Sequence, residues 1–280
     1  MSAPMQSPSS GQPMWTMPWI GFEVYELILY QVRLAAAGVE NTVITGPKGV
    51  GKTSMVRRAL DEFSDEEAER VAGTPEAEPV RNWVYYASGS ADGRKTALRD
   101  LLGALGRSTS PGRMRHWSVR DHCEAAVTDL RGTAGNRNAR VVCIDEADRI
   151  DLDNLNDLRQ VIDEADHRDY PLGMILIGNG AVASHLAANA ELGQRFSTAI
   201  AVGPFNGEEI RPRLPDLHPG LEALSKEDGW DELADDILDA ARGAVRRLER
   251  ILENADIFAR AKSRPLDDAA IRFALRKLAG

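Results

Sequence analysis

The sequence has few of the residues that build disulfide frameworks or metal sites. Its 280 residues include two cysteines, Cys123 and Cys143, and five scattered histidines. Two cysteines cannot form the disulfide network of a small secreted domain, and Cys143 lies in an apolar run, where a thiol packs as a small hydrophobe. No two histidines stand at metal-ligand spacing. We therefore expect a cytosolic protein without a metal site built from protein ligands alone.

Long hydrophobic runs are also missing. No apolar stretch approaches the roughly 20 residues that a membrane-spanning helix needs, so we expect no membrane-embedded segment. Residues 1–20 are rich in Pro, Ser and Met and lack the apolar core and the basic residues of a signal or transit peptide. This segment is expected to be a disordered tail. Trp15 and Trp19 are unusual in such a tail and could dock on the body of the protein or on a neighbour.

The charge balance is acidic, with 43 Asp and Glu against 34 Lys and Arg and a net charge of −9. This excess argues against non-specific nucleic-acid binding by the whole surface. Between residues 90 and 140 the sign reverses, and a local basic face can still bind phosphates because salt screens charges beyond about 10 Å. One segment, expected to be a surface loop, is crowded with acids: Asp61, Glu62, Asp65, Glu66, Glu67, Glu69, Glu76 and Glu78.

A complete G-x-x-x-x-G-K-T motif lies between an apolar stretch and an amphipathic one. Its residues, with the serine that follows, are Gly46, Pro47, Lys48, Gly49, Val50, Gly51, Lys52, Thr53 and Ser54. Backbone N–H groups of such a loop cradle a di- or triphosphate at a helix N-terminus, the lysine reaches the outer phosphates, and the threonine hydroxyl binds Mg²⁺. The motif predicts binding of a nucleoside triphosphate. Lys48 adds a cation that could bind phosphate, although simple exposure is the favoured interpretation.

The elements expected around this loop alternate between strand and helix. In chain order they are helix 22–37, strand 41–45, helix 54–60, strand 82–87, helices 96–105 and 119–131, strand 140–144, helix 152–165, strand 174–177, helix 181–192 and strand 199–202, followed by helices 231–240, 242–261 and 267–278. Alternation predicts an α/β fold with a five-stranded, mostly parallel sheet covered on both faces. We predict a nucleotide-binding domain over residues 21–204 and a small all-α domain over 205–280.

Two acids follow the expected third strand. Val141-Val142-Cys143-Ile144 is apolar, and Asp145-Glu146 comes directly after it. At the end of a buried strand, Asp145 would face the phosphate loop and hold Mg²⁺, either through water or together with Thr53. Glu146 would polarise an attacking water. Hydrolysis of a phosphoanhydride needs this division between metal charge on the leaving oxygens and an oriented nucleophile.

The order of these motifs resembles that of an AAA+ ATPase, from residue 22 to residue 278. The resemblance implies ATP and Mg²⁺ as ligands, and it assigns roles to three further residues. Asn179, at the tip of the fourth strand, would contact the γ-phosphate and the attacking water, although Asn179-Gly180 could be only a turn. Arg195 would be a finger that reaches the nucleotide of a neighbouring subunit, or else a surface arginine. In Gly243-Ala244-Val245-Arg246-Arg247, Arg246 matches the "sensor 2" arginine of the family's lid, with Arg247 as the alternative.

Within the family, the sequence Ile144-Asp145-Glu146-Ala147-Asp148-Arg149-Ile150 and the strand end at Asn179 resemble the ATPases that regulate DNA transposition, such as the phage Mu B protein and TnsC-type or TniB-type proteins. Origin-recognition initiators share much of this pattern. The resemblance implies head-to-tail assembly into a ring or filament on duplex DNA, bound through its backbone, and recruitment of a transposase. Candidate phosphate contacts are Arg94, Lys95, Thr96, Arg113 and Arg115, any of which could instead form a solvated face.

Other functions remain open on the sequence. The acidic balance favours a protein-remodelling, clamp-loading or initiator and helicase-loading ATPase whose partner is a protein. A signalling ATPase usually carries long repeats after the lid, and the chain has none. A small-molecule kinase fits less well, because the paired acids Asp145 and Glu146 suit hydrolysis better than transfer to an acceptor.

Overall fold

The structure is a computed structural model that describes residues 17–71, 83–88, 96–108, 114, 116–132 and 139–279. The chain divides into two compact units. We call Phe22–Gly203 the α/β unit. The second, the helical unit, comprises Pro204–Gly280 together with the residues that precede Phe22.

The α/β unit is built on a five-stranded parallel sheet, as predicted. Its strands are β1 (Thr42–Thr45), β2 (Trp83–Ala87), β3 (Val141–Asp145), β4 (Gly173–Gly178) and β5 (Thr198–Ala201). They lie in the order β2-β3-β4-β1-β5, and every neighbouring pair is parallel. Parallel strands end at the same edge, so the residues that follow β1, β3 and β4 meet there.

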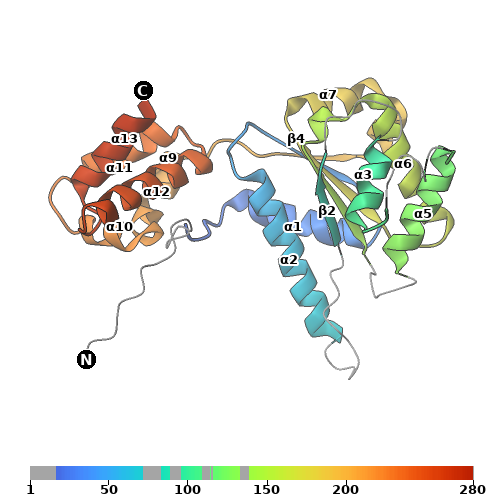
Figure 1. Ribbon diagram of the computed structural model, residues 1–280, viewed down its shortest axis with the longest axis horizontal. Helices are drawn as coiled ribbons and strands as arrows, with labels where there is room; N and C mark the ends of the chain where they lie inside the picture. Colours follow the sequence, from blue (N-terminus) through green and yellow to red (C-terminus); the bar gives the residue numbers. More distant parts are fainter. Residues whose placement is uncertain are drawn as a thin grey trace. The chain divides into compact units, whose positions relative to one another are not determined.

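Helices cover both faces of this sheet (Figure 1). They are α1 (Glu23–Ala36), α2 (Lys52–Val71), α3 (Thr96–Ala104), α5 (Val119–Arg131), the short 3₁₀ helix η1 (Ala147–Arg149), α6 (Leu152–His167), α7 (Gly180–Ala188) and α8 (Ala190–Arg195). Side chains alternate between the faces of a strand. Val142 and Ile144 of β3 belong to a buried cluster with α3, α5 and α6, so Cys143 and Asp145 face the opposite side, which α1 and α2 cover.

The acidic segment is helical, so the expectation of a surface loop is wrong for the acids from Asp61 to Glu69. They lie on α2, which is longer than predicted because Leu60 and Phe63 continue its buried stripe. Some acids have partners on α1: the Tyr25 hydroxyl donates to Glu62 at 2.6 Å, and Arg33 Nε donates to Glu66 at 3.0 Å. These contacts bind α1 to α2. Glu76 and Glu78 lie outside the described residues.

The helix predicted over residues 181–192 is two helices, α7 and α8. The chain breaks at Asn189, which has an extended backbone and whose side-chain oxygen accepts the N–H groups of Glu191 and Leu192. Asparagine favours such N-terminal caps over helix interiors. The break redirects the chain toward β5 and sets the position of Arg195.

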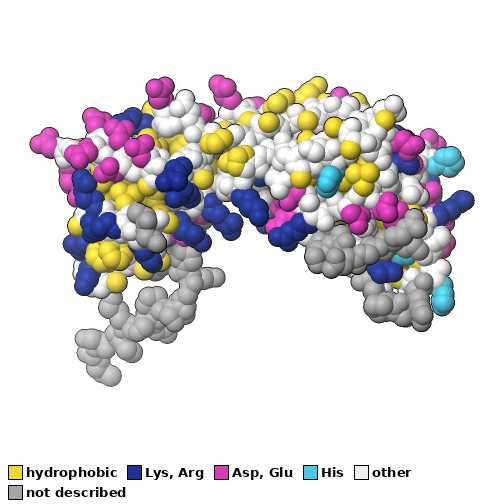
Figure 2. Space-filling model, turned by 90° about the horizontal axis from the view of Figure 1, so that it is seen from above, with side chains coloured by type: hydrophobic (Ala, Val, Ile, Leu, Met, Phe, Trp, Pro, Cys, Tyr) yellow, Lys and Arg dark blue, Asp and Glu magenta, His cyan; other side chains and the backbone are white. Residues whose placement is uncertain are grey.

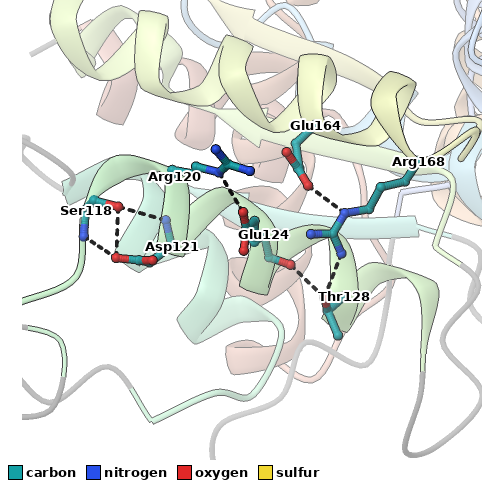
Figure 3. Close-up of polar contacts among 7 residues, drawn as sticks. All are labelled: Ser118, Arg120, Asp121, Glu124, Thr128, Glu164 and Arg168. Carbon is teal, nitrogen blue, oxygen red and sulfur yellow. Dashed lines mark hydrogen bonds and ion pairs between the residues drawn. The ribbon is translucent and has the colours of Figure 1, made fainter.

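Polar contacts organise α5 and α6 (Figure 3). Ser118 and Asp121 form a capping box at the start of α5, in which each side chain accepts the backbone N–H of the other. At the C-terminal end of α6, the capping residue Arg168 donates to Glu164 at 2.6 Å and to Thr128 of α5 at 3.2 Å. The two helices are thereby joined above the buried cluster.

The helical unit contains no described strand. Its helices are α9 (Gly207–Ile210), the 3₁₀ helix η2 (Arg211–Leu217), α10 (Pro219–Leu224), α11 (Trp230–Ala241), α12 (Val245–Ala261) and α13 (Asp268–Ala279). Ile237, Leu252 and Ile271 are fully buried among the last three. On the face of this unit seen in Figure 2, many Lys and Arg side chains gather apart from most of the Asp and Glu. Within the described ranges of the chain, no helix is long and apolar enough to cross a bilayer.

Close packing of α1 on the sheet requires glycine at position 173. A Cβ added to Gly173 would lie 2.3 Å from the backbone oxygen of Ala35. Because backbone atoms cannot swing away as a flexible side chain can, we expect Gly173→Ala to lower the free energy of unfolding by roughly 2–3 kcal/mol. Urea denaturation measures this loss. Gly180→Ala is the matched control, since nothing lies within 4 Å of its added Cβ; equal losses in both variants would contradict the packing argument.

Candidate functional site

The glycine-rich loop joins β1 to α2 and depends on backbone conformations that favour glycine. Gly46, Gly49 and Gly51 have φ values of +154°, +86° and +95°. A Cβ on Gly46 would also lie 2.1 Å from the carbonyl oxygen of Val202, just after β5. The loop is therefore packed against the end of a neighbouring strand. Pro47, Lys48 and Ser54 are exposed, while Val50 is buried beneath them.

Lys52, the first residue of α2, folds back over this loop. Its Nζ donates to the carbonyl oxygens of Gly46 at 2.7 Å and Pro47 at 2.8 Å. Burial lowers the pKa of Lys52 below its ordinary value and Lys48 lowers it further, while Asp145 and Asp148 oppose this shift. A partly buried cation held beside a second cation is well placed to receive a phosphate anion.

Thr53 and Asp145 meet as the sequence predicts. The Thr53 hydroxyl donates to Oδ2 of Asp145 at 2.7 Å, which links the start of α2 to the end of β3. The other carboxylate oxygen, Oδ1, accepts the backbone N–H of Glu146 at 2.8 Å. A hydroxyl and a carboxylate at a helix N-terminus form the oxygen-rich donor set that Mg²⁺ prefers. The residues present therefore fit a magnesium ion carried with phosphates.

Glu146 adopts a left-handed backbone conformation, with φ of +54°. This conformation is uncommon for a residue with a side chain and is found at functional sites. The Glu146 carboxylate forms an ion pair with Arg149, one turn further on, at 2.6 Å. Both side chains are about half exposed, so the pair contributes little to stability and the carboxylate remains accessible.

Asn179 begins α7, and its side chain is held by two contacts. The side-chain oxygen accepts the N–H of Ala181 at 2.8 Å, and Nδ2 donates to Asp148 Oδ2 at 2.9 Å. The backbone N–H of Asn179 donates to the other oxygen of Asp148 at 3.1 Å. Asn179 is thus both a helix cap and a partner of η1, which follows Glu146. One Nδ2 hydrogen remains for a further acceptor.

Arg195 ends α8 and forms two ion pairs with α6. Its guanidinium lies 2.6 Å from Asp163 and 3.0 Å from Asp166. The Arg195 side chain is 40% exposed, and exposed or half-exposed ion pairs of this kind contribute up to about 1 kcal/mol. Arg195 is therefore oriented by α6 and still able to exchange these carboxylates for another anion.

The remaining predicted residues lie elsewhere. Arg246 is exposed on α12 of the helical unit, beside Glu249, and Arg247 is partly buried. Of the candidate phosphate contacts, Thr96 is the first residue of α3. Four candidates lie outside the described residues: Arg94, Lys95, Arg113 and Arg115. Their assignment stays a prediction.

Two residues at this edge of the sheet were not foreseen as part of the site. Tyr85 of β2 donates its hydroxyl hydrogen to Asp145, and Asp148 binds Asn179 through both its carboxylate oxygens. The spacing of Asp148, three residues after Asp145, could have indicated a role. Tyr85 gave no such signal, because its proximity to Asp145 depends on the pairing of β2 with β3.

This arrangement is suited to phosphoanhydride hydrolysis. The loop and Lys52 offer N–H donors to a triphosphate, Thr53 and Asp145 offer oxygen ligands to its metal, and Glu146 offers a base beside them.

The fold resembles several solved structures of low sequence identity. The ORC2 protein of Aeropyrum pernix, in ADPNP-ADP complexes, is 19% identical over 95% of this chain and 70% of its own, with a TM-score of 0.64.

Two more solved structures have a similar fold. Cdc6p of Pyrobaculum aerophilum is 18% identical over 97% of this chain and 70% of its own, with a TM-score of 0.64. The ORC1 protein of A. pernix, in complex with DNA, is 18% identical over 90% of this chain and 65% of its own, with a TM-score of 0.60.

A comparison with curated protein sequences found no match. The family described as "AAA domain" matches residues 38–185. Since this match spans more than half of the sequence, the chain belongs to the AAA domain family and is an ATPase.

Proposed function

We propose that this ATPase is a nucleotide-controlled switch: ATP binding with Mg²⁺ promotes head-to-tail assembly on duplex DNA, and hydrolysis reverses it. The observation that carries the proposal is the contact between Thr53 and Asp145, at the edge of the sheet where Glu146 and Asn179 also lie. It supports a site that hydrolyses ATP. For assembly, the proposal adds Arg195, which is assigned to the site of a neighbouring subunit.

The residues divide the work of hydrolysis. Lys52 and the loop N–H groups bind the β- and γ-phosphates, and Thr53 and Asp145 hold Mg²⁺, which supplies positive charge to the leaving oxygens. Glu146 turns from Arg149 toward a water and accepts its proton as the oxygen attacks phosphorus. Asn179 orients that water or the γ-phosphate with the Nδ2 hydrogen that Asp148 leaves unused.

Assembly follows from Arg195. We propose that its guanidinium leaves Asp163 and Asp166 to contact the γ-phosphate held by a neighbouring subunit, where a planar cation suits charge spread over several oxygens. Such a contact joins two different surfaces of the chain, so it produces closed rings or helical filaments. Arg246 on α12, or Arg247 beside it, stays the predicted sensor 2 arginine.

Duplex DNA is the proposed surface for assembly. Two proteins of similar fold are described with DNA: the A. pernix ORC1 protein in complex with DNA, and Drosophila ORC bound to DNA. Within this chain, Thr96 lies at the N-terminus of α3, where backbone N–H groups favour phosphate. Arg94 and Lys95 precede it directly in sequence. Contacts of this kind bind the DNA backbone without recognising sequence.

The biological role is proposed at a finer level from motifs alone. The resemblance around Ile144–Ile150 favours a regulator of DNA transposition that recruits a transposase. A second candidate, an initiator or helicase-loading ATPase, is favoured by the fold comparisons with ORC and Cdc6 proteins. The two roles differ in the protein partner. Affinity capture on ATP-bound protein with DNA, using a transposase and a replicative helicase as alternative baits, distinguishes them.

Glu146→Gln tests the assigned base. The amide keeps the shape of the side chain but cannot accept a proton, so we expect ATP hydrolysis to fall by roughly a hundredfold or more while ATP binding is retained. Phosphate release and fluorescent-nucleotide binding measure the two properties. Glu222→Gln, which removes an exposed carboxylate from α10, is the control and should hydrolyse normally. Turnover of the Glu146→Gln variant at the parental rate would show that another group activates the water.

Neutralising Arg94 and Lys95 together tests the DNA contact. We expect the double alanine variant to bind duplex DNA several-fold more weakly in the presence of a slowly hydrolysed ATP analogue, and its affinity to depend less steeply on salt. Fluorescence anisotropy across a salt series measures both effects. The control, Arg120→Ala with Lys226→Ala, removes the same charge from two exposed side chains. Equal weakening in both variants, or none in either, would favour a protein partner instead.

A further inference from the structure

Asp145 has a hydrogen-bond donor that the nucleotide-site motifs do not supply. The Tyr85 hydroxyl donates to Oδ2 of Asp145, the same oxygen that accepts the Thr53 hydroxyl at 2.7 Å. Oδ1 accepts the N–H of Glu146. Three donors, from β2, α2 and the chain after β3, thus surround one carboxylate and fix the plane in which its oxygens lie.

The position of Tyr85 is set by the sheet. In the register of β2 with β3, Tyr85 lies opposite Cys143, and Ala87, two residues further along β2, lies opposite Asp145. Cys143 and Asp145 project from the face covered by α2, and Tyr85 shares that face. The tyrosine side chain is long enough to reach along the strand direction to the carboxylate. β2 is an edge strand of the sheet, so Tyr85 reaches Asp145 from the outermost strand on that side.

Arg57 holds the other side of the tyrosine. The centre of its guanidinium lies 4.2 Å from the centroid of the Tyr85 ring, a cation–π distance. Arg57 is one helical turn after Thr53 on α2. Thr53 and Arg57 therefore both act on Asp145 from α2. Thr53 donates to the carboxylate directly, and Arg57 contacts the ring of the tyrosine that donates to it.

We propose that Tyr85 is a positioning residue for magnesium: its hydroxyl holds Asp145 in the orientation that serves the metal of Mg-ATP, and Arg57 holds the Tyr85 ring in place. Tyr85 does not touch the nucleotide. Groups that orient metal ligands in this way commonly affect metal affinity by 10–100-fold. The proposal depends on the ATPase site alone and is independent of assembly and DNA.

Tyr85→Phe removes the hydroxyl and keeps the ring. In a titration of fluorescent-ATP binding with Mg²⁺, we expect the magnesium concentration at half-saturation to rise roughly tenfold. Binding of the same nucleotide in EDTA should stay within about twofold of the parent, because Lys52 and the loop are untouched. Arg57→Met, which removes the exposed cation, should move the magnesium midpoint in the same direction by a smaller factor.

Tyr170→Phe is the matched control. Its hydroxyl is buried and lies within hydrogen-bond distance of the backbone oxygens of Leu130 and Ala139, away from the loop. That variant should leave the magnesium midpoint unchanged even if thermal stability falls. An unchanged midpoint in Tyr85→Phe would overturn the proposal. So would an equal shift in Tyr170→Phe, or an equal loss of binding in EDTA, since each would indicate a general effect on folding.

Discussion

The contact between the Thr53 hydroxyl and the Asp145 carboxylate is the interaction on which the site depends. It joins the first turn of α2 to the end of β3 at 2.7 Å, and so fixes the phosphate loop relative to the acids that follow the strand. Each neighbour of the carboxylate has a separate origin in the fold. Glu146 follows it in sequence, and Tyr85 reaches it from the paired edge strand. One side chain therefore connects the chain after β3, the edge strand β2 and the start of α2, the helix that follows the loop.

The same edge of the sheet contains a second connection, between the chain after β3 and the chain after β4. Asp148 accepts hydrogen bonds from the backbone and the side chain of Asn179. Glu146, two residues before Asp148, is in a left-handed conformation and pairs with Arg149. These contacts hold the chain after β3 against the start of α7, the helix that precedes α8 and Arg195.

Much of the fold follows from local sequence patterns. A run of four β-branched residues marks β1, and four apolar residues followed by two acids mark β3. The loop motif with its positive-φ glycines specifies the strand–loop–helix unit. Features that depend on tertiary contacts were missed or misassigned. The acids of α2 suggested a loop because their partners on α1 are distant in sequence. The break at Asn189 and the contact of Tyr85 with Asp145 depend on a cap and on a strand register that local patterns do not specify.

The proposed role of Arg195 implies that the site is not complete in one chain. It lies on α8 against Asp163 and Asp166, in ion pairs weak enough to exchange. The direct test mixes two variants that are each impaired: Arg195→Ala, which keeps Glu146, and Glu146→Gln, which keeps Arg195. A shared site predicts that phosphate release by the equimolar mixture exceeds the sum of the two proteins assayed separately, because a neighbour's Arg195 completes an intact site. Activity equal to that sum would contradict a site shared between subunits.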